Sequence, residues 1–78
     1  MSENLKDLTA NDIRLILSFA TNNMRIAATA AAVGLDKTTV YRRLLTINKK
    51  SRLDPRNFRD LCMLVSLIEA GDDGTDSR

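Results

Sequence analysis

Apolar residues recur at intervals of three and four along most of the chain, the spacing that places them on one side of an α-helix. Strict alternation, the pattern of a half-buried strand, is rare. Only three glycines and one proline punctuate the sequence, so few positions force a helix to end. We therefore predict an all-α fold. A chain of 78 residues makes one domain near the lower size limit for a stable core, so its helices must pack compactly.

Start and stop signals divide the chain into four predicted helices. Thr9 and Asp12 have the spacing of a capping box before the first helix. Asn23 is the expected cap of the second helix, and Gly34 ends it, because glycine tolerates the backbone angles found just past a helix end. Pro55 suits the first position of the last helix. The expected helices cover residues 10–20, 24–33, 37–49 and 55–70.

The second and third predicted helices, with Gly34 between them, have the sequence features of a helix-turn-helix. Ala30 leaves room where the two helices cross, four residues before the glycine. Val40, six residues after it, anchors the third helix to the core, and Leu44 and Ile47 lie on the same face. The pattern therefore predicts a four-helix domain that contains a helix-turn-helix.

Positive charge is concentrated in and after the third helix. The net charge of the chain is +2, but residues 37–59 contain eight Lys or Arg and one Asp, a net charge of +7. A basic zone is typical of polyanion binders, although a solvated basic face is the common alternative. In a helix-turn-helix the second helix enters the DNA major groove, where Arg reads guanine and Thr contacts bases or phosphates. The candidate DNA-binding residues are Lys37, Thr38, Thr39, Tyr41, Arg42, Arg43, Lys49 and Lys50.

Different positions in this set suit different contacts. Thr38 and Arg42 face away from the buried side of the predicted helix and are the candidate base readers. Thr39 and Arg43 are better placed for phosphates. Tyr41 is expected to pack at the edge of the core with its hydroxyl near a phosphate, and the two lysines at the end of the helix supply nonspecific attraction.

The run TTVYRRLLTINKKSRLDPRNFRDLCMLVSL, residues 38–67, resembles the C-terminal helix-turn-helix of PucR-type regulators, which control purine catabolism and sugar-diacid use. The resemblance extends over about residues 13–70 and includes the related Fis-type helix-turn-helix. It implies a cytoplasmic DNA-binding domain, either nucleoid-associated in a bacterium or encoded by a phage or mobile element. Such domains normally follow long sensory regions, so a stand-alone relative or an excised piece is expected. The most characteristic positions are Thr39, Val40, Arg43, Leu44, Ile47, Leu53, Asp54, Pro55, Arg56 and Phe58.

The sequence offers little for catalysis or cofactor binding. It contains no His and a single cysteine, Cys62, which we expect in the core. One thiol, without a signal peptide or a long apolar span, indicates the cytoplasm and no membrane segment. We therefore predict that the protein is not an enzyme and uses no cofactor or metal.

The last predicted helix is apolar around most of its circumference. Met63, Leu64 and Leu67 lie outside its main stripe and form a candidate homodimer surface. The alternative is that the first helix, widened by Leu15 and Phe19, covers them within one monomer. The expected core stripe consists of Phe58, Leu61, Cys62, Val65 and Ile68.

Together these patterns predict a sequence-specific double-stranded DNA-binding protein, a homodimeric transcriptional regulator with residues 37–49 in the major groove. Two alternatives remain open. The basic face could dock the acidic surface of a protein partner, or the chain could be an architectural DNA binder or a recombination accessory protein. The expected organisation is an N-terminal arm over residues 1–9, the helix-turn-helix domain over 10–70 and a disordered acidic tail over 71–78.

Overall fold

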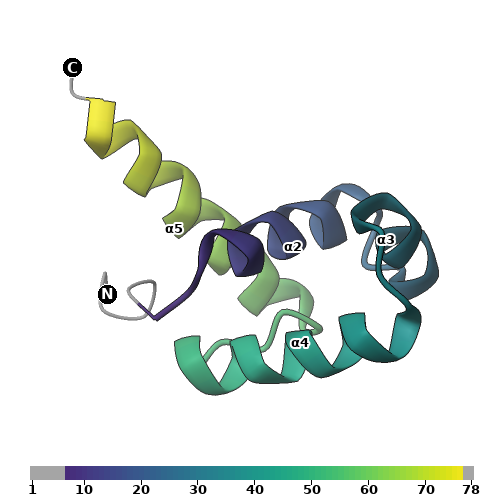
Figure 1. Ribbon diagram of the computed structural model, residues 1–78. Coiled ribbons are helices and arrows are strands. Elements are labelled where there is room, and N and C mark those ends of the chain that lie inside the picture. The colour runs from purple at the N-terminus through teal and green to yellow at the C-terminus, as the bar shows by residue number, and fades with distance from the viewer. Residues whose placement is uncertain (1–6, 77–78) are drawn as a thin grey trace.

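The computed structural model describes residues 7–76, and in that range the chain forms four α-helices (Figure 1). No strand occurs among these residues, so the prediction of a small all-α domain is confirmed. None of the helices described is long and apolar enough to span a membrane. The helices are α2 (Ala10–Thr21), α3 (Ile26–Val33), α4 (Lys37–Ser51) and α5 (Phe58–Asp76).

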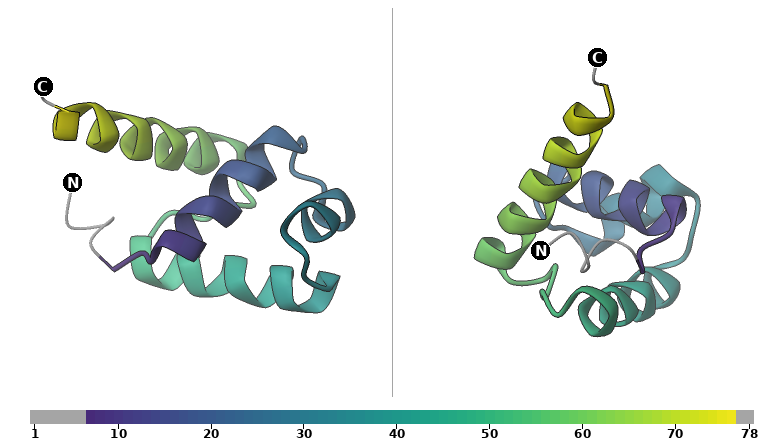
Figure 2. Two further views of the ribbon diagram at one scale, coloured as in Figure 1. Left: turned by 45° about the horizontal axis from the view of Figure 1, so that its top comes forward. Right: turned by 90° about the vertical axis from the view of Figure 1, so that its left-hand side faces the viewer.

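Helix α2 lies at the centre of the molecule and contacts the other three helices, while α3 also packs against α4 (Figure 2). Leu15, Ile16 and Phe19 of α2 are buried in one cluster with Val40 and Leu44 of α4. Full burial of a side chain of this kind contributes roughly 1.5–3 kcal/mol. The packing of α2 therefore fixes the position of α4.

The predicted capping box at the start of α2 is confirmed. The Thr9 hydroxyl accepts a hydrogen bond from the Asp12 amide at 3.0 Å, and the Asp12 carboxylate accepts one from the Thr9 amide at 3.0 Å. Leu8, which we assigned to an N-terminal arm, is buried against the core. Residues 1–6 of that predicted arm lie outside the described residues.

The loop between α2 and α3 differs from the prediction. Helix α3 begins at Ile26, with Arg25 at the cap position and no side-chain cap, so the predicted start at Met24 with an Asn23 cap is wrong. Asn23 and Met24 instead take left-handed backbone angles, with φ of 57° and 63°. The Met24 amide donates to the Phe19 carbonyl at 2.8 Å and closes the end of α2. Asparagine suits both a helix start and a left-handed turn, and here the turn prevails.

Helix α5 begins three residues after its predicted start at Pro55. Residues 54–57 form a turn, in which the Asn57 amide donates to the Asp54 carbonyl at 2.9 Å. The Asn57 side chain then accepts the Asp60 amide at 3.1 Å, so Asn57 caps the helix. Asp and Asn are equally good caps, so the residue types alone do not decide between Asp54, which precedes the predicted start at Pro55, and Asn57.

The other end of α5 is also different. The helix continues through Gly71 to Asp76, whereas we predicted an end at Ala70. A glycine inside a helix costs only about 1 kcal/mol relative to alanine, so it allows a helix to continue as well as to stop. The predicted disordered tail over residues 71–78 is therefore helical as far as Asp76, and residues 77–78 lie outside the described residues.

The buried face of α5 is rotated from the predicted stripe. Leu61, Leu64 and Ile68 are buried, whereas Phe58 is 68% exposed and Cys62 is exposed. The predicted core positions of Phe58 and Cys62 are therefore wrong. Leu64 belongs to the core and is therefore not part of the predicted dimer surface, whereas Met63 is exposed. Packing against α2 determines which face of α5 is buried, and that face is centred on Leu61, Leu64 and Ile68.

Candidate nucleic-acid interface

The turn between α3 and α4 has the geometry of a helix-turn-helix. Gly34 follows α3 in the left-handed conformation, with φ of 73°, which would cost a residue with a Cβ roughly 1–2 kcal/mol. The amides of Gly34 and Leu35 both donate to the Ala30 carbonyl. Ala30 is 4% exposed where the helices cross, and Val40 is fully buried. Ala30, Gly34 and Val40 therefore have the structural roles predicted for them.

Helix α4 presents a polar, basic side opposite its buried one. Thr38, Arg42 and Lys49 are exposed, and their spacing of four and seven residues places them on one face. Lys37 and Arg43 are exposed on either side of that face. The orientation predicted for Thr38 and Arg42 is therefore confirmed. The buried side consists of Val40, Leu44, Ile47 and Ser51.

One acid, Asp36, lies at the start of this basic helix. Its carboxylate occupies the cap position but makes no cap hydrogen bond. The pKa of Asp36 is lowered. The main cause is the Thr39 side chain, and backbone groups and the charge of Arg42 lower it further. Thr39 is half-buried. A negative charge here makes the first turn of α4 less favourable for an anion than the basic positions further along the helix.

Lys50, one of the predicted DNA-binding residues, pairs with Asp12 of α2. Its Nζ lies 2.8 Å from Asp12 Oδ2, the oxygen that also accepts the Thr9 amide. Burial alone would raise the pKa of Asp12, but the Lys50 ammonium and the Thr9 hydrogen bonds together lower it. Lys50 thus ties the end of α4 to the start of α2, and its charge is compensated. Lys49 beside it is exposed.

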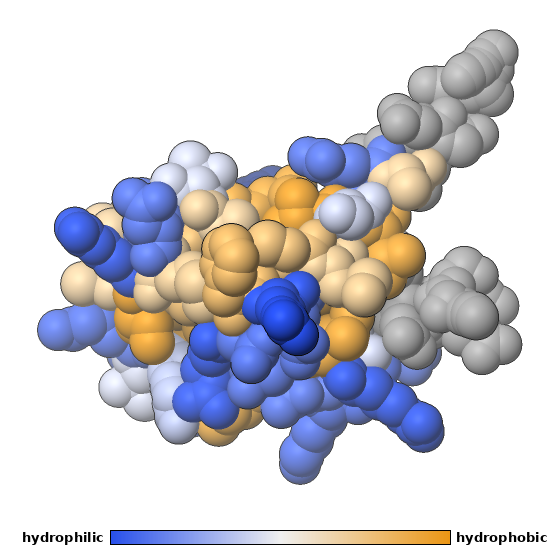
Figure 3. All heavy atoms as spheres, turned by 180° about the vertical axis from the view of Figure 1, so that it is seen from behind, coloured by the Kyte–Doolittle hydropathy of each residue, from blue (hydrophilic) through white to orange (hydrophobic). Residues whose placement is uncertain are grey.

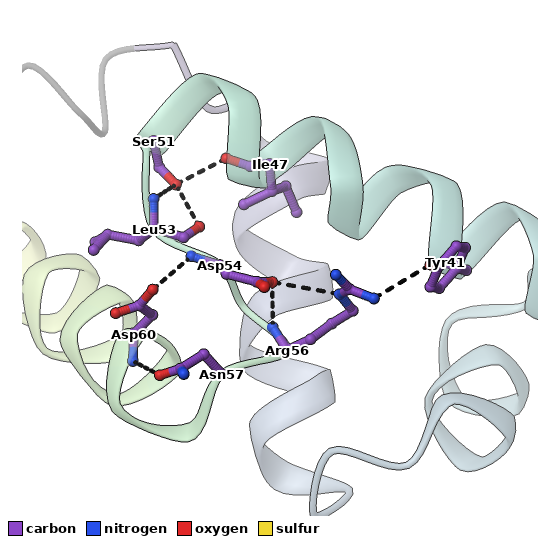
Figure 4. A network of polar contacts seen from close by, with 8 residues as sticks. All are labelled: Tyr41, Ile47, Ser51, Leu53, Asp54, Arg56, Asn57 and Asp60. Carbon is purple, nitrogen blue, oxygen red and sulfur yellow. Dashed lines mark hydrogen bonds and ion pairs between the residues drawn. The ribbon is translucent and has the colours of Figure 1, made fainter.

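The segment after α4 places Arg56 against the exposed face of that helix (Figure 4). The Arg56 guanidinium donates to the Tyr41 hydroxyl at 3.3 Å and lies 5.2 Å from the centre of the Tyr41 ring. Its Nε and its amide donate to the Asp54 carboxylate at 3.4 and 2.9 Å. The Asp54 amide donates to Asp60 of α5 at 3.0 Å. Tyr41 and Arg56 are thereby held as a pair at one edge of the basic face.

Helix α4 also continues two residues beyond its predicted end at residue 49. Residues up to Ser51 are helical, and Arg52 follows the helix with a left-handed φ of 66°. The buried Ser51 hydroxyl donates to the Ile47 carbonyl at 2.8 Å and accepts the Leu53 amide at 3.1 Å (Figure 4). These bonds direct the chain back towards α4 and so position Arg56.

Helix α2 adds a basic residue that the sequence pattern did not identify. Arg14 and Arg43 line the same hollow of about 160 Å³, together with Asn11. Arg14 belongs to a segment whose net charge is −1, so no local signal distinguishes it. Only the packing of α2 against α4 brings Arg14 next to Arg43 and extends the basic surface beyond α4.

No group of His, Cys, Asp or Glu side chains in residues 7–70 has an arrangement that could hold a metal ion. Comparison of the chain with protein-family models, curated proteins and solved structures found no match, so the resemblance to PucR-type domains stays a prediction.

Proposed function

We propose that the chain is a sequence-specific double-stranded DNA-binding protein that regulates transcription in the cytoplasm, with the N-terminal half of α4 in the major groove. One observation carries this proposal. Helix α4 is the second helix of a helix-turn-helix, one side of it is buried, and Thr38 and Arg42 are exposed on the opposite side. Recognition helices present base-reading side chains in this way.

Basic residues on both sides of that face support the proposal. Arg43 and Arg14 lie on the side of α2, and Arg56 lies at the edge held by Tyr41. Phosphate contacts on either side of the groove set the register of a recognition helix, and the release of counterions supplies much of the affinity. Lys49 extends the surface towards the end of α4.

The test begins by selecting bound duplexes from a random DNA pool. Arg42→Ala should then weaken binding to the selected site by about 1–3 kcal/mol, the value of a good bidentate base contact. Arg42→Lys keeps the charge and removes the bidentate geometry, so it should retain affinity for random DNA while discriminating less. Neither change should move the urea unfolding midpoint, because the side chain is exposed. Unchanged affinity of Arg42→Ala for the selected site would refute this placement of α4.

The same selection separates the other two candidate functions. Tight binding to duplex DNA without any selected sequence would indicate an architectural binder. No duplex binding even at low salt would indicate that the basic face docks an acidic protein surface. Binding that falls steeply with salt and survives competitor DNA at one sequence supports the proposed regulator.

A further inference from the structure

One face of α5 is exposed and is not used by the core. Arg59, Cys62, Ser66 and Glu69 are all exposed and follow one another at intervals of three, four and three residues. This is the spacing of a and d positions in a helix that pairs with another helix. Phe58, which is 68% exposed, flanks this face. We refer to Arg59, Cys62, Ser66 and Glu69 as the outer stripe of α5.

An apolar groove of about 490 Å³ lies next to the outer stripe, between α5 and the end of α2. Its walls include Ala20, Met24, Leu61 and Val65, and Phe58 also lines it. Figure 3 shows the molecule from the side on which α5 is nearest to the viewer. Apolar side chains form a broad area on this side. A two-fold pair formed through this surface would cover the groove of both copies.

We propose that two copies of the chain pair through the outer stripe, with their α5 helices antiparallel. Arg59 lies near the N-terminus of α5 and Glu69 ten residues later. In an antiparallel pair with a-to-d layers, Arg59 of each copy faces Glu69 of the other, and Cys62 faces Ser66. A parallel pair would instead place Arg59 against Arg59 and Glu69 against Glu69, which is repulsive. The order of charges therefore selects a second copy and its direction.

The middle of the stripe supports close approach of the two helices. Cys62 and Ser66 are small, so the helix backbones can come close to one another. Both residues also line the apolar groove, which therefore lies at the contact between the two copies. This pairing replaces the dimer surface predicted from Met63, Leu64 and Leu67, because Leu64 is buried within the monomer. The pairing involves α5 and the groove at the end of α2, and none of the candidate DNA-binding residues, so it can be tested without DNA.

Sedimentation equilibrium without DNA, at tens of micromolar protein, tests the pairing. The unaltered chain should be dimeric. Arg59→Glu and Glu69→Arg should each weaken dimerisation roughly tenfold or more, because each converts two attractive contacts into two repulsive ones. The double variant restores both attractions and should recover the dimer. Lys49→Glu makes the same charge change on α4 and should leave the dimer intact.

Circular dichroism shows whether each variant keeps its helices. A monomeric unaltered chain would overturn the pairing, and so would a double variant as weak as the single ones. The single cysteine gives a second measurement. In the antiparallel pair the two Cys62 residues are offset by about four residues, or roughly 6 Å along the helix. A short bismaleimide should link them in the unaltered chain and not in Arg59→Glu, and a dimer that cannot be linked would contradict this register.

Discussion

Asp12 connects the start of α2 to the end of α4. Its carboxylate closes the capping box with Thr9 and pairs with Lys50, 38 residues further along the chain. The first role could be predicted, because it depends on a spacing of three residues. The second could not, because nothing local to Lys50 distinguishes it from Lys49. The exposed face of α4 could therefore be predicted from the sequence. That Lys50 pairs with Asp12 and does not belong to this face depends on tertiary packing, which the sequence pattern does not show.

The paired carboxylate of Asp12 predicts a decrease of stability in acid. Its folded-state pKa is lowered, so the ionised form stabilises the fold above the unfolded-state pKa, and this contribution disappears as the pH falls through the folded-state pKa. We expect the urea midpoint to fall below about pH 4. Asp12→Asn should lower the midpoint at neutral pH and make the fall in acid smaller. Part of the fall should remain, because the pKa of Asp36 is also lowered. If Asp12→Asn leaves the urea midpoint unchanged at neutral pH, the Asp12 carboxylate contributes nothing to the stability of the fold.

Leu64 and Phe58 provide a matched test of the buried face of α5. Leu64→Ala should cost about 2–5 kcal/mol of unfolding free energy, because the side chain is fully buried. Phe58→Ala should change it by only about 0.5 kcal/mol, although more apolar atoms are removed, because Phe58 is exposed. Urea unfolding in dilute protein, where self-association does not contribute, measures both. A larger cost for Phe58→Ala would restore the face predicted from the sequence.

The helices themselves could be predicted more reliably than their ends. Periodicity identified all four, and α2 and α4 have nearly the predicted ranges. The start of α3 and both ends of α5 were missed, because Asn23, Asp54 and Gly71 each suit two conformations at similar energy. Packing decides between them. Packing against α2 likewise determined which face of α5 is buried, and it left Phe58 exposed.

Two helices are followed by a residue with left-handed backbone angles. One of these residues is a glycine, which suits such angles, and the other is an arginine, which does not. Gly34 after α3 and Arg52 after α4 have φ of 73° and 66°. Gly34→Ala should cost roughly 1–2 kcal/mol from the backbone alone, because a Cβ at Gly34 would meet no atom within 4 Å. Gly34→Asn should cost less, since asparagine tolerates this region. Arg52→Gly should raise stability by up to about 1 kcal/mol. Thermal unfolding compares the three variants, and a destabilised Arg52→Gly would mean that the Arg52 side chain contributes more than its backbone strain costs.

Across the whole molecule, the basic surface is assembled from three parts of the chain. Helix α4 supplies Arg42, Arg43 and Lys49, α2 supplies Arg14, and the segment before α5 supplies Arg56. Net charge by segment predicted only part of this, because Arg14 comes from an acidic segment and Lys50 is paired with an acid. Under the proposed function, the fold therefore sets how many charges meet DNA, and the salt dependence of binding measures that number.

The slope of log affinity against log salt changes by about 0.9 for each DNA phosphate that the protein no longer neutralises. Lys49→Gln and Arg14→Gln should each make the slope shallower by about that amount, because both side chains are exposed. Lys50→Gln should leave the slope unchanged, since Asp12 already compensates that charge. Asp12→Asn frees Lys50 and should leave the slope unchanged or make it steeper. Fluorescence anisotropy with one duplex over a series of salt concentrations gives all four slopes. Equal effects of Lys49→Gln and Lys50→Gln would show that DNA displaces the Asp12 pair, and the basic surface would then include the end of α4 that faces α2.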